Sequence, residues 1–180
     1  KNMPEEFDDS VMNQAILSTG NDVGDLAMEL FGDYTEVPYS ESLSEMIPAT
    51  QKLIDDGVVN ICEASFSYDG CFCSVDILKN LGENKVELYE VKSSTEVKDI
   101  YKEDVSYQNW VLTKLGFDVQ KVCLVHINNQ YVRHGELELD KLFTIVDLTD
   151  LAKSKVSEVE DNIAKFREYL EQEEEPECKV

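Results

Sequence analysis

Two neighbouring apolar segments of this chain carry acidic residues in their interior. The first is Val75-Asp76-Ile77-Leu78, and the second is Glu87-Leu88-Tyr89-Glu90-Val91-Lys92. Both have the composition of strands, and an unpaired carboxylate inside such a strand costs free energy. Because side chains alternate along a strand, Glu90 and Lys92 share a face, and pairing of the two strands brings Asp76 beside them. The chain must therefore fold so that these charged groups meet.

The other segments predict an α/β fold. Hydrophobic periodicity and turn residues, including the hairpin signal Asp69-Gly70, divide the chain into helices and strands. We expect helices at 22–31, 42–56, 98–115 and from 149 or 150 to 171, and strands at 58–67, 71–78, 85–92, 117–127 and 142–148. This order predicts a mixed central sheet flanked by helices, with a C-terminal helix.

The length of 180 residues favours a single domain. We expect an acidic N-terminal segment at 1–20, which includes the turn signal Asp8-Asp9-Ser10. The core should occupy 21–150, and a C-terminal helix with a frayed acidic tail should occupy 151–180.

The charge balance limits the partners. The chain has 16 basic and 38 acidic residues, for a formal net charge of -22. Such a surface repels nucleic acid, so any nucleic-acid contact must come from a local basic or metal-loaded patch. A simpler interpretation is an acidic interaction module whose carboxylates only solvate it.

The five cysteines favour a reducing compartment. Their odd number and the lack of a secretory segment predict a cytoplasmic protein. Cys71 and Cys73 are expected to share a strand face with Val75 and Ile77, which favours buried thiols over a metal pair. Cys178, in the acidic tail, is a candidate reactive or ligating thiol. No apolar run approaches the roughly 20 residues needed to span a bilayer, so no membrane contact is expected.

The acidic strand residues suit a hard divalent cation. Asp76 and Glu90 supply carboxylates, and the carbonyl of Val91 adds a third oxygen if that strand ends irregularly. A bound Mg²⁺ or Mn²⁺ activates water and neutralises charge on a scissile phosphate, while Lys92 orients the water or stabilises the transition state. Glu63 in the preceding strand and Glu29 on the first helix are further candidate metal ligands.

Several residues after Lys92 are candidate nucleic-acid contacts. Ser93 and Ser94 offer hydroxyls, and Gln108 offers an amide to a phosphate or a base. Tyr107 can stack on a base; Trp110 can stack too, but core packing is favoured for it. The two histidines, His126 and His134, are interpreted as a structural and a surface residue, respectively.

At these residues the sequence resembles the PD-(D/E)XK nuclease superfamily. The resemblance is stronger to the RecB-like branch, which includes CRISPR-associated exonucleases. It is strongest to an uncharacterised bacterial nuclease-like domain of unknown function. The likeness covers most of residues 20–150. Its matching segments are Asp22-Val23-Gly24-Asp25-Leu26-Ala27, Leu30-Phe31, Glu63-Ala64-Ser65-Phe66, Asp69-Gly70, Val75-Asp76-Ile77-Leu78, Glu90-Val91-Lys92-Ser93-Ser94-Thr95, Val97-Lys98-Asp99, Asp104-Val105-Ser106-Tyr107-Gln108, Tyr131-Val132-Arg133 and Gly135-Glu136-Leu137.

The resemblance implies a restriction-endonuclease-like core and Mg²⁺- or Mn²⁺-dependent hydrolysis of DNA, with exonuclease action on single strands or ends. It implies that Asp76 and Glu90 bind the metal, that Lys92 is the catalytic lysine, and that Gln108 is the motif glutamine. Protein partners or further domains of a longer chain are left open.

The sequence departs from that family at three points. The first helix has no histidine and carries Met28 near its place, and Leu112 stands where a tyrosine usually follows the glutamine. Many relatives hold an iron–sulfur cluster through one early and three late cysteines. This chain has only Cys178 in its tail, so no cluster is expected. A catalytically degenerate nuclease fold that binds nucleic acid or protein is therefore the alternative.

Overall fold

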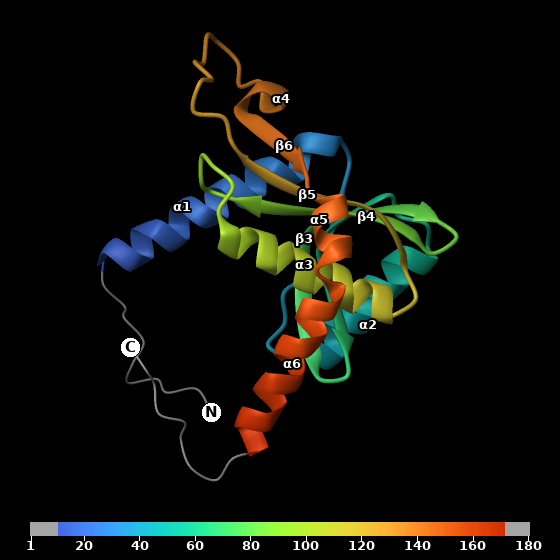
Figure 1. Cartoon of the computed structure of the whole chain (residues 1–180). Helices are drawn as coiled ribbons and strands as arrows, with labels where there is room; N and C mark the ends of the chain where they lie inside the picture. Colours follow the sequence, from blue (N-terminus) through green and yellow to red (C-terminus); the bar gives the residue numbers. More distant parts are fainter. Residues whose placement is uncertain (1–10, 172–180) are drawn as a thin grey trace, which may run out of the picture.

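The computed structural model describes residues 11–171, with side chains from residue 20 onward. The expected Asp8-Asp9-Ser10 signal, Cys178 and the acidic tail beyond Glu171 lie outside that range. Six strands form one sheet in the order β1 to β6 (Figure 1). They are β1 (Thr35–Glu36), β2 (Asn60–Tyr68), β3 (Cys71–Gly82), β4 (Lys85–Lys92), β5 (Asp118–Ile127) and β6 (Phe143–Asp147).

The sheet is mixed, as expected from the sequence. The β2–β3, β3–β4 and β5–β6 pairs are antiparallel, whereas β1–β2 and β4–β5 are parallel. The helices are α1 (Val11–Met28), η2 (Glu29–Phe31), α2 (Leu43–Asp55), α3 (Asp99–Lys114), α4 (Leu139–Leu142), α5 (Thr149–Ser154) and α6 (Val156–Glu171). The predicted fold class, an α/β sheet flanked by helices with a C-terminal helix, is confirmed.

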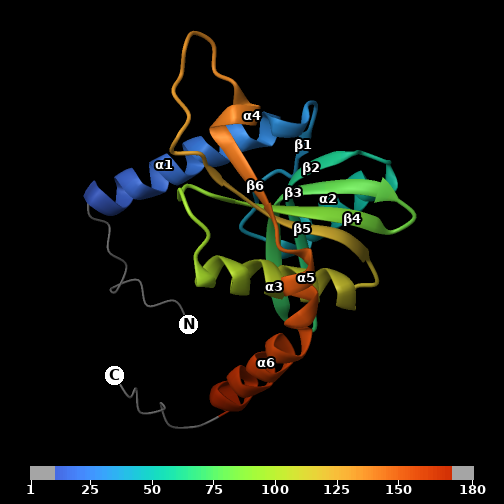
Figure 2. The same cartoon turned by 45° about the horizontal axis from the view of Figure 1, so that its top comes forward.

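Helices cover both faces of the sheet and divide the core into two parts. The larger part lies between the sheet and α2, α3, α5 and α6, and includes Leu88, Leu112 and Leu124. The smaller part lies under α1, η2 and α4, and includes Ile77 and Tyr89. Figure 2 shows α1 on one side of the sheet and α3, α5 and α6 on the other. No helix within 11–171 is both long and apolar enough to cross a membrane.

Three predicted boundaries were wrong. The first helix begins at Val11 instead of residue 22, because Gly20 is accommodated inside α1. The strand predicted at 71–78 is β3, which continues to Gly82. The turn that follows is only Glu83-Asn84, and both residues take positive φ, as a tight hairpin turn requires. The terminal helix is divided at Lys155 into α5 and α6.

The β2–β3 hairpin changes face in its middle. Val75 and its partner Ala64 belong to the larger core, whereas Ile77 and its partner Cys62 belong to the smaller one. Regular alternation would place them on the same face, so the expectation that Ile77 shares a face with Val75 was wrong. The change occurs at Glu63, which has a φ of 56° and falls opposite Asp76 in this register.

Thr50 joins α2 to the outer edge of β2. Its hydroxyl is fully buried, donates to the Met46 carbonyl at 3.1 Å and accepts from the Ser65 amide at 2.9 Å. β1 pairs with β2 only at Ile61 and Cys62, so the Ser65 amide has no strand partner on that side. Thr50 therefore satisfies a buried donor that the short β1 leaves free.

We expect Thr50→Val to destabilise the fold by about 1–3 kcal/mol, because valine has nearly the same volume but leaves the Ser65 amide unpaired. Urea denaturation measures the loss. Thr113→Val, at an exposed position of α3, is the control and should change stability by less than about 0.5 kcal/mol. Equal stability of the two variants would contradict the assigned role of Thr50.

Candidate functional site

The site lies where β3 and β4 separate. Their ladder pairs Ile77 with Tyr89, and the next opposed residues, Asp76 and Glu90, are not paired through their backbones. Instead, the Asp76 carboxylate accepts the Val91 amide N–H at 2.6 Å. A side chain thus replaces a ladder hydrogen bond, which holds the two strands apart and turns the Asp76 carboxylate toward β4.

Lys92 lies among acidic groups from two elements. Its Nζ is 2.5 Å from Glu90 Oε1 and 2.7 Å from Asp104 Oδ2. From α3, Gln108 Nε2 donates to Glu90 Oε2 at 2.7 Å and to Asp104 Oδ1 at 3.1 Å. The predicted residues Glu90, Lys92 and Gln108 therefore form one hydrogen-bonded cluster, with Asp76 on the neighbouring strand.

The cluster is buried and its charges interact strongly. Burial raises the pKa of Asp76 to about 7, and the nearby Glu63 adds to the rise. Burial likewise raises the pKa of Glu90 to about 8, and repulsion from Asp76 and Asp104 adds to it. Burial lowers the pKa of Lys92, but Glu90 and Asp104 raise it by more. Lys92 is thus charged at neutral pH. Its single positive charge does not offset the effect of burial on the pKa values of the two carboxyls.

Glu63 lies close to Asp76 but has a separate hydrogen bond. Its Oε2 accepts the Ser74 hydroxyl at 3.3 Å, and burial raises its pKa. A non-glycine residue with positive φ inside a strand is strained, and such strain concentrates at functional sites. Glu63, Asp76 and Val91 line one cavity of about 480 Å³ between α1 and the sheet.

Glu29, the remaining predicted carboxylate ligand, is exposed on η2 and does not line this cavity. Two acids that were not predicted as ligands, Asp25 of α1 and Glu36 of β1, do line it. The Val91 amide bonds to Asp76; the role of its carbonyl remains a prediction. Among the described residues, no three His, Cys, Asp or Glu side chains lie close enough to one another to hold a metal ion.

The candidate nucleic-acid contacts are spread around Lys92. Ser93 is exposed, but the Ser94 hydroxyl bonds to the Glu96 backbone and so stabilises the local turn. The Tyr107 hydroxyl donates to the Phe72 carbonyl at 2.9 Å. Gln108 is only 3% exposed and its Oε1 has no partner, so it acts on the cluster and not on the surface.

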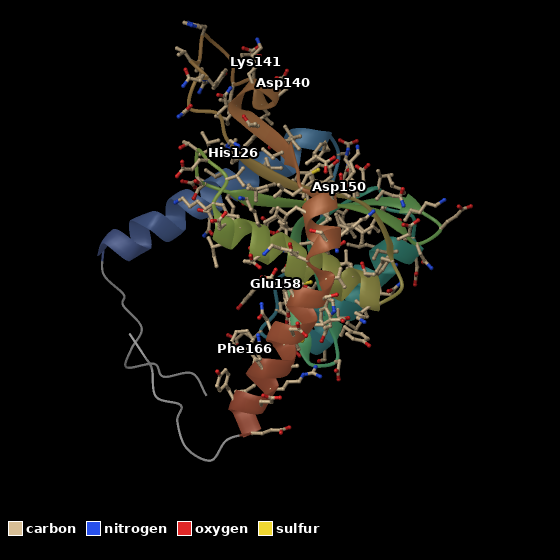
Figure 3. All side chains as sticks on the ribbon, in the orientation of Figure 1. His126, Asp140, Lys141, Asp150, Glu158 and Phe166 are labelled. Carbon is tan, nitrogen blue, oxygen red and sulfur yellow. The ribbon has the colours of Figure 1, made fainter. Side chains whose placement is uncertain are left out.

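Two other predictions agree with the structure. Trp110 is buried, and its indole N–H donates to Glu160. His126, which Figure 3 labels, is buried on β5, where it pairs with Lys92 of β4. His134 is exposed.

Asp104 is the site residue that sequence reasoning missed. It stands four residues before Gln108 on α3, so both side chains reach the same side of the helix. That spacing was the available signal. Asp25 and Glu36 had no comparable signal, because their places in the cavity lining depend on how α1 and β1 pack against the sheet.

We expect the free energy of unfolding to fall as the pH rises from about 4, where these carboxyls ionise in the unfolded chain, to about 8. The pKa values of Asp76 and Glu90 are higher in the folded chain than in the unfolded one. Protonation therefore favours folding, and this contribution is lost as the pH passes about 7 and then about 8. Urea denaturation at several pH values measures the fall.

Asp76→Asn keeps an oxygen for the Val91 amide and should make that fall shallower. Asp99→Asn is the control, because the pKa of Asp99 is lowered by Lys102 and its contribution is lost only at acidic pH. A parent and an Asp76→Asn variant with the same slope would show that Asp76 has an ordinary pKa.

Comparisons with known proteins complete the description of the site. No family model, no curated protein and no solved structure matched this chain.

Proposed function

We propose that the chain is a divalent-metal-dependent nuclease that hydrolyses DNA phosphodiester bonds in the cytoplasm, with an exonuclease-like action. The observation that carries this proposal is the hydrogen-bonded cluster of Glu90, Lys92 and Gln108 at the fork between β3 and β4, where Asp76 accepts the neighbouring Val91 amide. The resemblance of the sequence to PD-(D/E)XK nucleases, with Asp76, Glu90 and Lys92 as the motif residues, supports it.

The donor set fits a hard cation. Asp76 and Glu90 are carboxylates on adjacent strands whose pKa values are raised by burial and, to a lesser extent, by nearby acids, and water would complete the ligand set that Mg²⁺ prefers. Asp76, Glu90 and the Val91 carbonyl would hold the cation, with Glu63 beside them. A bound cation would neutralise charge on the scissile phosphate and lower the pKa of the attacking water.

The residues of the chain would share the remaining work. Lys92 carries a full positive charge and would donate to a phosphate oxygen as negative charge develops there. Asp104 holds the Lys92 ammonium together with Glu90. Gln108 holds Glu90 and Asp104 with one amide and thereby fixes the position of Lys92. Asp104 and Gln108 are thus positioning residues.

A second candidate function is a degenerate nuclease fold that binds nucleic acid or protein without cutting. The observation that favours it is the state of Lys92, which is engaged by two carboxylates and so already neutralises part of the site. In this alternative the lysine replaces the cation. Cleavage and metal binding separate the two functions.

Lys92→Ala should reduce DNA cleavage by at least about 100-fold, because the donor that stabilises transition-state charge is lost. The measurement is the cleavage rate of labelled single-stranded and double-stranded DNA in Mn²⁺ or Mg²⁺. Lys52→Ala, at an exposed ion pair on α2, should cleave at the parent rate. A parent without activity would favour the non-cutting alternative, and equal activity in Lys92→Ala would remove this lysine from the mechanism.

Glu90→Gln should weaken Mn²⁺ binding by more than about tenfold, because it removes a carboxylate ligand while keeping an acceptor for Gln108. Electron paramagnetic resonance of free Mn²⁺ measures the affinity without any need for cleavage. Glu87→Gln is the control: it lies on the same strand but bonds to Tyr89 and Lys121. A parent that does not bind Mn²⁺ would contradict the metal-dependent nuclease and leave the degenerate fold and the acidic interaction module.

A further inference from the structure

A second cavity is lined by Lys92, which does not line the first. It is a groove of about 540 Å³ between α3 and α6, within the usual size range of sites for small ligands. Its apolar lining consists of Ile100, Tyr101 and Tyr107 from α3 and Val159, Ile163 and Phe166 from α6. Figure 3 shows the Phe166 side chain on the flank of α6.

The walls of the groove are held in place. Trp110 of α3 donates to Glu160 of α6 at 3.2 Å, and Lys155 forms an ion pair with Glu103. The Tyr107 ring stacks on Trp110 with centroids 6.4 Å apart. A groove that is already formed can bind a ligand without the cost of ordering its own side chains.

The rim of the groove exposes large apolar side chains. Ile100 is 68% exposed and Phe166 is 66% exposed, although they lie beside the apolar floor formed by Val159 and Ile163. A contiguous exposed apolar surface of this kind marks a binding site more often than single exposed residues do.

The groove is continuous with the proposed nuclease site. Lys92 and Asp104 line it as well as belonging to the cluster at the strand fork. The Lys92 ammonium lies 5.6 Å from the centre of the Tyr101 ring. A cation for a phosphate and an aromatic face for a base therefore lie side by side, which is the combination that a nucleotide requires.

We propose that this groove binds an unpaired nucleobase of the strand whose phosphate lies at Lys92. The inference rests on the proposed function and deepens it, because it makes a single strand or an unpaired end the preferred substrate. Bases within a duplex are stacked on both faces and cannot enter.

The binding test uses an oligothymidine with uncharged methylphosphonate linkages and a fluorescent label. Such a probe is not repelled by the acidic chain, needs no metal and is not a normal cleavage substrate. Fluorescence anisotropy gives its affinity. We expect Phe166→Ala and Tyr101→Ala each to weaken binding by about 5- to 150-fold. An abasic probe with the same backbone should bind the parent as weakly as the oligothymidine probe binds these two variants.

Tyr169→Ala is the matched control, because Tyr169 is an exposed aromatic residue of α6 that does not line the groove. It should bind the probe like the parent. The proposal is overturned if the parent does not bind the probe, if the abasic probe binds equally well, or if the Phe166 and Tyr101 variants bind like the parent.

Cleavage of ordinary single-stranded DNA separates this proposal from the proposed function. A parent that binds the probe through Phe166 and Tyr101 but cuts no DNA would support the groove and contradict the nuclease. If the parent cuts, Phe166→Ala should raise KM more than it lowers kcat, whereas an unchanged KM would overturn the groove proposal.

Discussion

The hydrogen bond from the Val91 amide to the Asp76 carboxylate is the contact on which the site depends. It closes the β3–β4 ladder with a side chain at the point where the two backbones stop pairing. On the other side of β3, the face change at Glu63 lets Asp76 turn out of the apolar alternation of its strand. Without these two irregularities, Asp76 would be a buried acid without a partner.

The acidic cluster illustrates how burial and charge act together. Lys92 is shared by Glu90 and Asp104, and Asp76 adds a third carboxylate to one ammonium. In water this excess of negative charge would cost little free energy. Glu90 is only 6% exposed, however, and the low local dielectric raises that cost. Proton uptake relieves it in the free chain, and a bound cation would relieve it without a proton.

The sequence predicted the α/β class because its apolar periods are clear, as in the dense run Val122-Cys123-Leu124-Val125 of β5. It also predicted that Glu90 meets Lys92, because strand alternation places both on one face, but it missed Asp104, the second acid at this lysine. It could not predict the face change, since alternation rules assume regular strands and Glu63 carries no signal of positive φ. The position of Asp25 in the cavity that Asp76 lines depends on helix packing, which local patterns do not encode.

The attachment of α6 has a consequence for how its free end responds to salt. Val159 is buried in the core, but the outer turns are tied down by Arg167, which bonds to Asp69 at the tip of the β2–β3 hairpin. That ion pair is exposed, and dissolved ions screen exposed pairs far more than buried ones. As ionic strength rises, the last turns of α6 should fray before the sheet loses any stability. The tip of the β2–β3 hairpin therefore anchors the part of α6 that carries Phe166 and forms one wall of the groove.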